Sequence, residues 1–132
     1  MDARALVEDF QLFDNWEDRY TYLIDLGRAL PPFPEDNRVD RYKVDGCLSQ
    51  VWFMQDTTQE GVVAFDADSD SAIVRGLIGV IRVLFHGQPF EHAREVDVGQ
   101  VFAQIGLDEH LSVNRRNGFY AMIERVRTYI GS

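Results

Sequence analysis

The residue with the clearest chemical potential in this sequence is Cys47, the only cysteine in the chain. Gly46 precedes it and allows unusual backbone angles, while Ser49 and Gln50 follow it as polar donors. Lys43 lies close by in the sequence and can favour the thiolate over the thiol. A thiolate on a loop can attack sulfur in another molecule and carry it away as a persulfide. Because the chain has no second thiol, that sulfur must then leave to an external acceptor.

Two other roles for Cys47 stay open at this point. Free cysteine is among the most buried residue types, so the thiol can belong to the core of a noncovalent regulatory module. A hydrolase that pairs the thiol with a histidine is the other alternative, although no spacing singles out His86, His92 or His110. We expect His86 at the C-terminus of a helix, where the helix dipole favours a cationic ring.

Familiar cofactor and metal motifs do not occur in the sequence. There is no GxxxxGK[ST], GxGxxG or HExxH pattern, and one cysteine with three histidines lacks the paired spacing of a structural zinc site. One cysteine also excludes an internal disulfide and is too few to ligate an iron–sulfur cluster in the usual way. We therefore expect neither a resident metal nor a cofactor.

Composition favours a cytoplasmic protein whose partner is a protein or a small molecule. The chain has 13 basic and 22 acidic residues, a formal charge of -9, which argues against binding nucleic acid or anionic membranes. Its start, MDARALVEDF, resembles neither a signal peptide nor a transit peptide. The apolar run at 76–85 is far shorter than the ~20 residues that a membrane span needs.

The elements that must position Cys47 are helices and a β-hairpin. The length of 132 residues and a hydrophobic content of 45% suit one domain over 1–132. Segments 49–55 and 61–67 carry strand-forming residues around a turn. Helical spacing indicates further segments near 3–13, from Asn15 to the prolines at 31–34, at 68–87 and at 112–130. The sum is an α+β fold, a small antiparallel sheet of about three strands packed against helices.

The segment 68–87 should be a buried central helix, because apolar residues lie nearly all round it. Its three cap-type residues are Asp68, Ser69 and Asp70. Gly76 and Gly79 should allow this helix to pack closely on the sheet. The final helix should bury one face, formed by Phe119, Met122, Ile123, Val126 and Ile130.

Several segments resemble one family. VDGCLSQVW at 44–52 resembles the GCxSQVW signature of the SufE family, sulfur acceptors that take persulfide sulfur from a PLP-dependent cysteine desulfurase during iron–sulfur cluster assembly. NWEDRYTYLIDLGRALP at 15–31, DSDSAIVRGLIGVI at 68–81 and LDEHLSVNRRNGFYAMIERVR at 107–127 are similar to the family's first long helix, central helix and C-terminal segment. The resemblance implies a SufE/IscU-like α+β fold.

The resemblance also implies roles for individual residues. Cys47 falls on the persulfide-forming cysteine, Asp70 on an aspartate near the desulfurase surface, and Arg115 on the arginine before the last helix. Partner contacts are expected from Gly46, Ser49, Gln50, Asp70 and Arg115. The implied partners are a SufS-like or CsdA-like desulfurase, which keeps its own PLP, and a SufBCD-like scaffold, and a homodimer stays open. The resemblance also implies that this protein stimulates the desulfurase and is not itself an enzyme.

Overall fold

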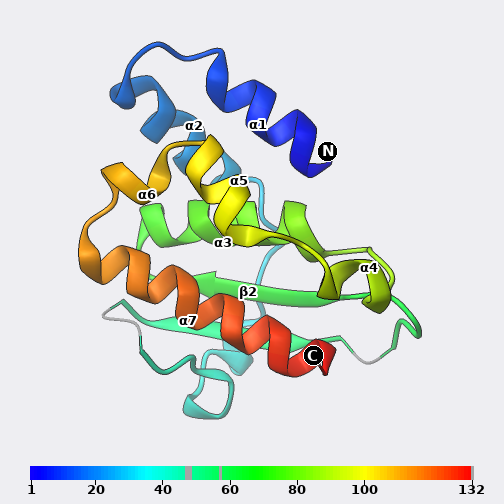
Figure 1. Ribbon diagram of the computed structural model, residues 1–132. Coiled ribbons are helices and arrows are strands. Elements are labelled where there is room, and N and C mark those ends of the chain that lie inside the picture. The colour runs from blue at the N-terminus through cyan, green and yellow to red at the C-terminus, as the bar shows by residue number, and fades with distance from the viewer. Residues whose placement is uncertain (47–48, 57, 132) are drawn as a thin grey trace.

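The computed structural model describes residues 1–46, 49–56 and 58–131, which form α-helices, short 3-10 helices and an antiparallel strand pair (Figure 1). The elements in chain order are α1 (Ala3–Gln11), α2 (Trp16–Arg28), η1 (Glu35–Asn37), η2 (Asp40–Tyr42), β1 (Val51–Gln55), β2 (Phe65–Ser69), α3 (Ala72–Phe85), α4 (Phe90–Arg94), α5 (Val98–Gln104), α6 (Leu107–His110) and α7 (Val113–Ile130). The predicted α+β class is confirmed.

Strands β1 and β2 pair in an antiparallel register that places Val51 opposite Ser69 and Gln55 opposite Phe65. The predicted hairpin is therefore present. Side chains alternate between the two faces of a strand pair, so Phe53 and Phe65 share one face and stack with ring centroids 5.1 Å apart. Helices α3 and α7 lie over that face, with α7 running along the strands (Figure 1).

The sheet departs from the prediction in extent. Within the described ranges it has two strands rather than about three, and β2 begins at Phe65 rather than at Gly61. Val63 pairs instead with the turn after α3: its N–H donates to the carbonyl of Gln88 at 2.8 Å, and its own carbonyl accepts from Gly87 at 2.7 Å. Strand-forming residues are thus used to close the turn after the central helix.

Helix starts follow local hydrogen bonding. Asn15 caps α2 as predicted, because its side chain accepts from the Asp18 amide at 2.8 Å. The central helix is capped by Ser71, since Asp68 and Ser69 belong to β2 and are buried. The prediction that Asp68, Ser69 and Asp70 cap α3 was wrong, because strand pairing extends to Ser69 and the side chain of Asp70 accepts from the Gln50 amide instead.

Gly76 and Gly79 pack against α2, not against the sheet as predicted. A Cβ on Gly76 would overlap the carbonyl oxygen of Leu23, and a Cβ on Gly79 would lie 3.0 Å from the Cβ of Leu26. The contact is mutual, because a Cβ on Gly27 of α2 would lie 2.7 Å from the amide nitrogen of Gly76. The missing side chains let the two helix backbones approach closely.

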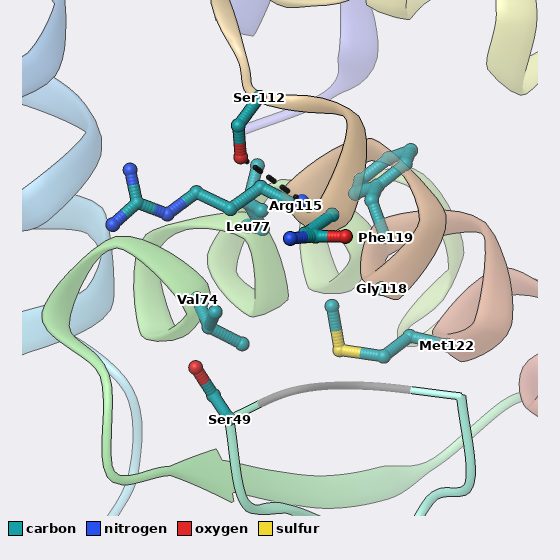
Figure 2. Close-up of a pocket in the computed structure, with 9 residues that line it drawn as sticks. Ser49, Val74, Leu77, Ser112, Arg115, Gly118, Phe119 and Met122 are labelled. Atoms are coloured by element: carbon teal, nitrogen blue, oxygen red, sulfur yellow. Dashed lines mark hydrogen bonds between the residues drawn. The ribbon is translucent and has the colours of Figure 1, made fainter.

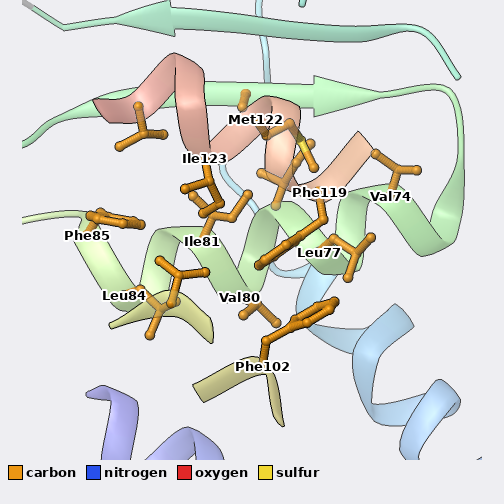
Figure 3. Packing of buried hydrophobic residues seen from close by; sticks show 14 of the residues in the cluster. Val74, Leu77, Val80, Ile81, Leu84, Phe85, Phe102, Phe119, Met122 and Ile123 are labelled. Atoms are coloured by element: carbon orange, nitrogen blue, oxygen red, sulfur yellow. The ribbon is translucent and has the colours of Figure 1, made fainter. Parts of the chain in front are cut away.

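Helix α3 is the centre of the hydrophobic core (Figure 3). Its buried residues lie around most of the helix, as predicted: Val74, Gly76, Leu77, Ile78, Gly79, Val80, Ile81, Leu84 and Phe85. The predicted inward face of α7 is confirmed, with Phe119, Met122, Ile123, Val126 and Ile130 all buried. Phe119 stacks on Phe102 of α5 at 4.4 Å between ring centroids. One buried cluster therefore includes side chains from α1 through α7.

The other face of the strand pair is covered by the chain between α2 and β1. Asp68 is 5% exposed and pairs with Arg38 at 2.5 Å and with Arg75 at 3.1 Å. The Arg38 guanidinium also lies over the ring of Trp52, 5.5 Å from its centroid. Both guanidinium groups compensate the charge of buried Asp68, and the pair with Arg38 holds the crossing segment against β2.

His86 is the C-terminal cap of α3, where the sequence places it, but the expected cationic ring is not favoured there. Burial, and then the Arg82 guanidinium, lower the pKa of His86 below its ordinary value of 6.5, while Asp66 and Asp56 oppose that shift. The Nδ1 atom faces the amide of Phe65 at 3.4 Å, as expected of a neutral ring that accepts a hydrogen bond.

The glycine contact between α2 and α3 predicts the effect of Gly76→Ala. Alanine favours helices by about 1 kcal/mol over glycine, but its methyl group would displace α2, so we expect a net loss of about 1–3 kcal/mol in the free energy of unfolding. Urea denaturation measures it. Gly99→Ala is the matched control, since a Cβ there meets nothing closer than 3.7 Å and should be neutral or stabilising. Equal effects of the two substitutions would contradict the close contact.

The environment of His86 predicts a pH dependence of stability. Because the folded-state pKa is lowered, the contribution of the neutral ring is present above the unfolded value of 6.5 and is lost as pH falls through the folded-state value. His86→Gln should therefore flatten the fall in stability between about pH 7 and pH 5. Urea denaturation across that range tests this, with His92→Gln as the control for loss of one imidazole. An NMR titration midpoint of His86 above 6.5 would contradict it.

Candidate functional site

Cys47 lies outside the residues that the structure describes, and its nearest described neighbours are Gly46 and Ser49. Gly46 has a φ of +89°, a left-handed conformation that glycine adopts without strain. A Cβ at this position would lie 3.3 Å from the Cβ of Ala121, so the backbone before Cys47 runs close to α7. Ser49, after it, is half-buried and lines a cavity.

This cavity has a volume of about 390 Å³ and lies between the approach to β1, the start of α3 and the first half of α7 (Figure 2). Its lining residues are Ser49, Val74, Leu77, Ser112, Asn114, Arg115, Gly118, Phe119 and Met122. Figure 2 shows Ser49 on one side and Ser112 with Arg115 on the other, with Val74 and Met122 between them. Apolar side chains thus form the interior and polar groups the rim.

The electrostatics of the cavity favour an anion. Two helices begin at it: Ser71 caps α3 by accepting from the Val74 amide at 3.4 Å, and Ser112 caps α7 by accepting from the Arg115 amide at 3.3 Å. The N-terminus of a helix carries a partial positive charge, which stabilises a nearby thiolate. The exposed guanidinium of Arg115 adds a full charge, whereas Lys43 does not line the cavity.

Gln50 and Asp70 form a separate, bonded pair beside the cavity. The Gln50 amide donates to Asp70 Oδ1 at 3.0 Å, and the Asp70 amide donates to the Gln50 carbonyl at 3.3 Å. Asp70 thus joins the start of β1 to the segment between β2 and α3. Neither residue lines the cavity. The structure brings Ser49 and Arg115 together, and it places Gln50 and Asp70 next to them.

Several cavity residues were not identified from the sequence. Ser112 had a local signal, since a serine before an apolar periodic segment is a helix cap. The remaining ones read as ordinary helical positions, and only packing brings α3 and α7 together: Val74, Leu77, Asn114, Gly118 and Met122.

The histidines lie elsewhere. His86 ends α3 at the opposite end from Ser71, His92 is exposed on α4, and His110 stacks on Trp16 at 3.7 Å. None of them lines the cavity. Over the described part of the chain, no three His, Cys, Asp or Glu side chains gather as a metal site would require. The helices found there are all too short or too polar to cross a bilayer.

Comparison with known proteins identifies relatives over almost the whole chain. A family model described as "SufE: Fe-S metabolism associated domain" matches residues 4–130. An uncharacterized SufE-like protein of Rhizobium etli is 41% identical over 125 residues, which cover 92% of this chain and 84% of the relative. Another from Rhizobium meliloti is 40% identical over 126 residues, 93% and 90% of the two chains.

A solved structure shares the fold. The solution structure of a hypothetical protein from Thermus thermophilus superposes with a TM-score of 0.78 over 97% of this chain and 92% of that one. The sequence identity is 22%, so the likeness concerns the fold alone.

The Gln50–Asp70 pair predicts how substitutions at position 70 behave. Asp70→Ala removes the acceptor of the Gln50 amide, so that amide should exchange with solvent faster and stability should fall by about 1 kcal/mol. Asp70→Asn keeps an acceptor oxygen and should preserve most of the protection. Amide hydrogen exchange followed by NMR measures both. Unchanged exchange at Gln50 in Asp70→Ala would show that the side chain does not hold this segment.

Proposed function

The chain belongs to the SufE family, and on that premise we propose that it is a sulfur carrier in which Cys47 accepts sulfur from a cysteine desulfurase. Family membership associates the chain with Fe–S metabolism. The proposal adds the cysteine, the donor and the direction of transfer. The donor is a SufS-like or CsdA-like enzyme that contributes its own PLP, and the acceptor is a SufBCD-like scaffold in the cytoplasm.

The proposed step exchanges one sulfur–sulfur bond for another. The desulfurase holds a persulfide on its own cysteine, and the Cys47 thiolate attacks the outer sulfur. A bond forms between Cys47 and that sulfur while the bond to the donor cysteine breaks, so the donor leaves as a thiolate. The step has no net oxidation or reduction, because thiolate and persulfide merely change places. Draining the donor's persulfide raises desulfurase turnover.

The observation that carries this proposal is the cavity next to the described neighbours of Cys47. Gly46 runs against α7 and Ser49 lines the cavity, whose rim holds Arg115 and the starts of α3 and α7. Positive groups favour a thiolate or persulfide anion over its protonated form. The apolar interior, which includes Val74 and Met122, limits the access of water to the persulfide, a group that is easily oxidised. A sulfur carrier must keep its persulfide anionic and shielded from water between loading and delivery.

The first experiment is intact-mass spectrometry after incubation with a cysteine desulfurase, PLP and cysteine. We expect a gain of about 32 Da, one sulfur on the persulfide, that reductant removes. Cys47→Ser keeps the shape of the side chain but not its thiolate chemistry, so it should show no gain and should no longer raise desulfurase turnover. Full stimulation by Cys47→Ser would refute the carrier and support a noncovalent regulatory module.

A further inference from the structure

A second cavity, of about 690 Å³, lies between η2, β1 and the C-terminal half of α7. Among the described residues it shares no lining residue with the first cavity, and it is independent of the proposed sulfur chemistry. Its lining residues are Arg41, Tyr42, Phe53, Met54, Gln55, Arg125, Thr128 and Tyr129. We call this the edge groove, because its β1 residues lie at the end of the strand.

The hydrogen bonding of β1 shows which of its backbone groups point into the edge groove. The carbonyl of Gln50 and the amide of Asp56 both bond across to the β2 side, at 3.3 and 2.8 Å. Backbone groups of successive residues alternate between the two edges of a strand. The N–H and C=O groups of the odd-numbered residues therefore point away from β2. These residues are Val51, Phe53 and Gln55.

That outer edge is paired only at its start, as far as the described residues go. The Val51 carbonyl accepts from the Val44 amide at 2.8 Å, next to the bridge between Lys43 and Trp52. From there the chain before β1 turns into η2, and no described segment pairs with the outward groups of Gln55, which is exposed. The far end of β1 is thus an open strand edge inside a groove.

The groove also holds cationic side chains that have no anionic partner among the described residues. Arg41 lies over the ring of Tyr42 at 5.3 Å, and Arg125 lies over the ring of Phe53 at 5.9 Å from the centroid. Neither guanidinium makes an ion pair or hydrogen bond with a described residue, a property shared only with Arg115 at the first cavity. Most arginines in this acidic chain contact a carboxylate or a carbonyl, so two guanidinium groups without such a partner in one groove favour an external anion.

We propose that the edge groove binds an extended, acidic segment of a partner protein as an added strand beside β1. The backbone of that segment pairs with the open edge at Gln55, the usual source of affinity in strand addition. Side chains alternate between the two faces along a strand, so acidic residues on the face covered by α7 reach Arg125, and Arg41 of η2 adds a second positive charge to the groove. Apolar residues on the opposite face contact Met54. The favoured segment alternates acidic and apolar residues.

The test uses a fluorescein-labelled peptide of about eight residues that alternates glutamate with valine, a length that strand addition can accommodate. Fluorescence anisotropy should show binding that weakens with salt, and a peptide alternating lysine with valine should not bind. Reversing both groove charges, in Arg41→Glu/Arg125→Glu, should weaken binding about tenfold or more. Arg4→Glu/Arg28→Glu makes the same change in net charge at exposed positions on α1 and α2 and should bind normally.

The strand pairing has its own readout. On binding, the Gln55 amide should become protected from hydrogen exchange. Gln55→Pro removes that outward N–H and should weaken binding, whereas Gln55→Val keeps it and should not. A thermal melt by circular dichroism confirms that each variant is folded. If Gln55→Pro does not fold, hydrogen exchange at the Gln55 amide of the unaltered chain still tests the strand pairing.

Three results would overturn the proposal. The first is equal affinity of the unaltered chain and the doubly reversed variant, and the second is an unchanged Gln55 amide at peptide saturation. The third is dimerisation, seen by light scattering and abolished by Arg41→Glu/Arg125→Glu, which would assign the edge groove to a second copy of this chain. None of these results bears on sulfur loading at Cys47, so the two proposals stand or fall separately.

Discussion

Helix α3 has apolar side chains around most of its circumference, so the other elements must cover it on every side. Helix α2 covers one side through the contact at Gly27 and Gly76, where both backbones lack an intervening side chain. The strand pair and α7 cover another side, and α1 and α5 extend the same cluster. Close packing leaves little freedom in these placements, because a displaced helix would open voids along its length.

The covering of α3 also determines the location of the candidate site. The helix begins at Ser71, immediately after β2, and α7 must lie along it to bury Phe119 and Met122. The starts of both helices therefore lie beside Ser49, at the entrance to β1. The hydrophobic requirement thus collects two helix N-termini at one place, and their partial positive charges add to that of Arg115. The positive charge at the cavity is therefore a consequence of how the helices pack.

Charge is distributed unevenly in this acidic protein. Most arginines donate to carboxylates or to carbonyls at the ends of elements, as Arg38 does to Asp68 and Arg94 to the carbonyl of Ile130. Within the described ranges, the guanidinium groups without such partners lie at the two cavities, on opposite portions of α7: Arg115 near its start, and Arg125, with Arg41 nearby, further along. The long final helix thus contributes both to the core and to two separate polar surfaces.

The sequence by itself determined the fold class, the helix that Asn15 caps, the buried central helix and the inward face of α7. These depend on periodicity and on caps, which act within one or two turns of chain. It also singled out Cys47 and its neighbours as candidate site residues, because residue types and a family signature are visible without coordinates.

Only the tertiary structure decided what depends on contacts between distant segments. It showed that Val63 pairs beyond α3 rather than with β1, that Asp68 is buried between two arginines, and that Gly76 faces α2. It placed Arg115 across a cavity from Ser49 and left the edge of β1 open beside Arg125. Periodicity shows that a face is buried but not what covers it, since any apolar surface of matching shape can do so.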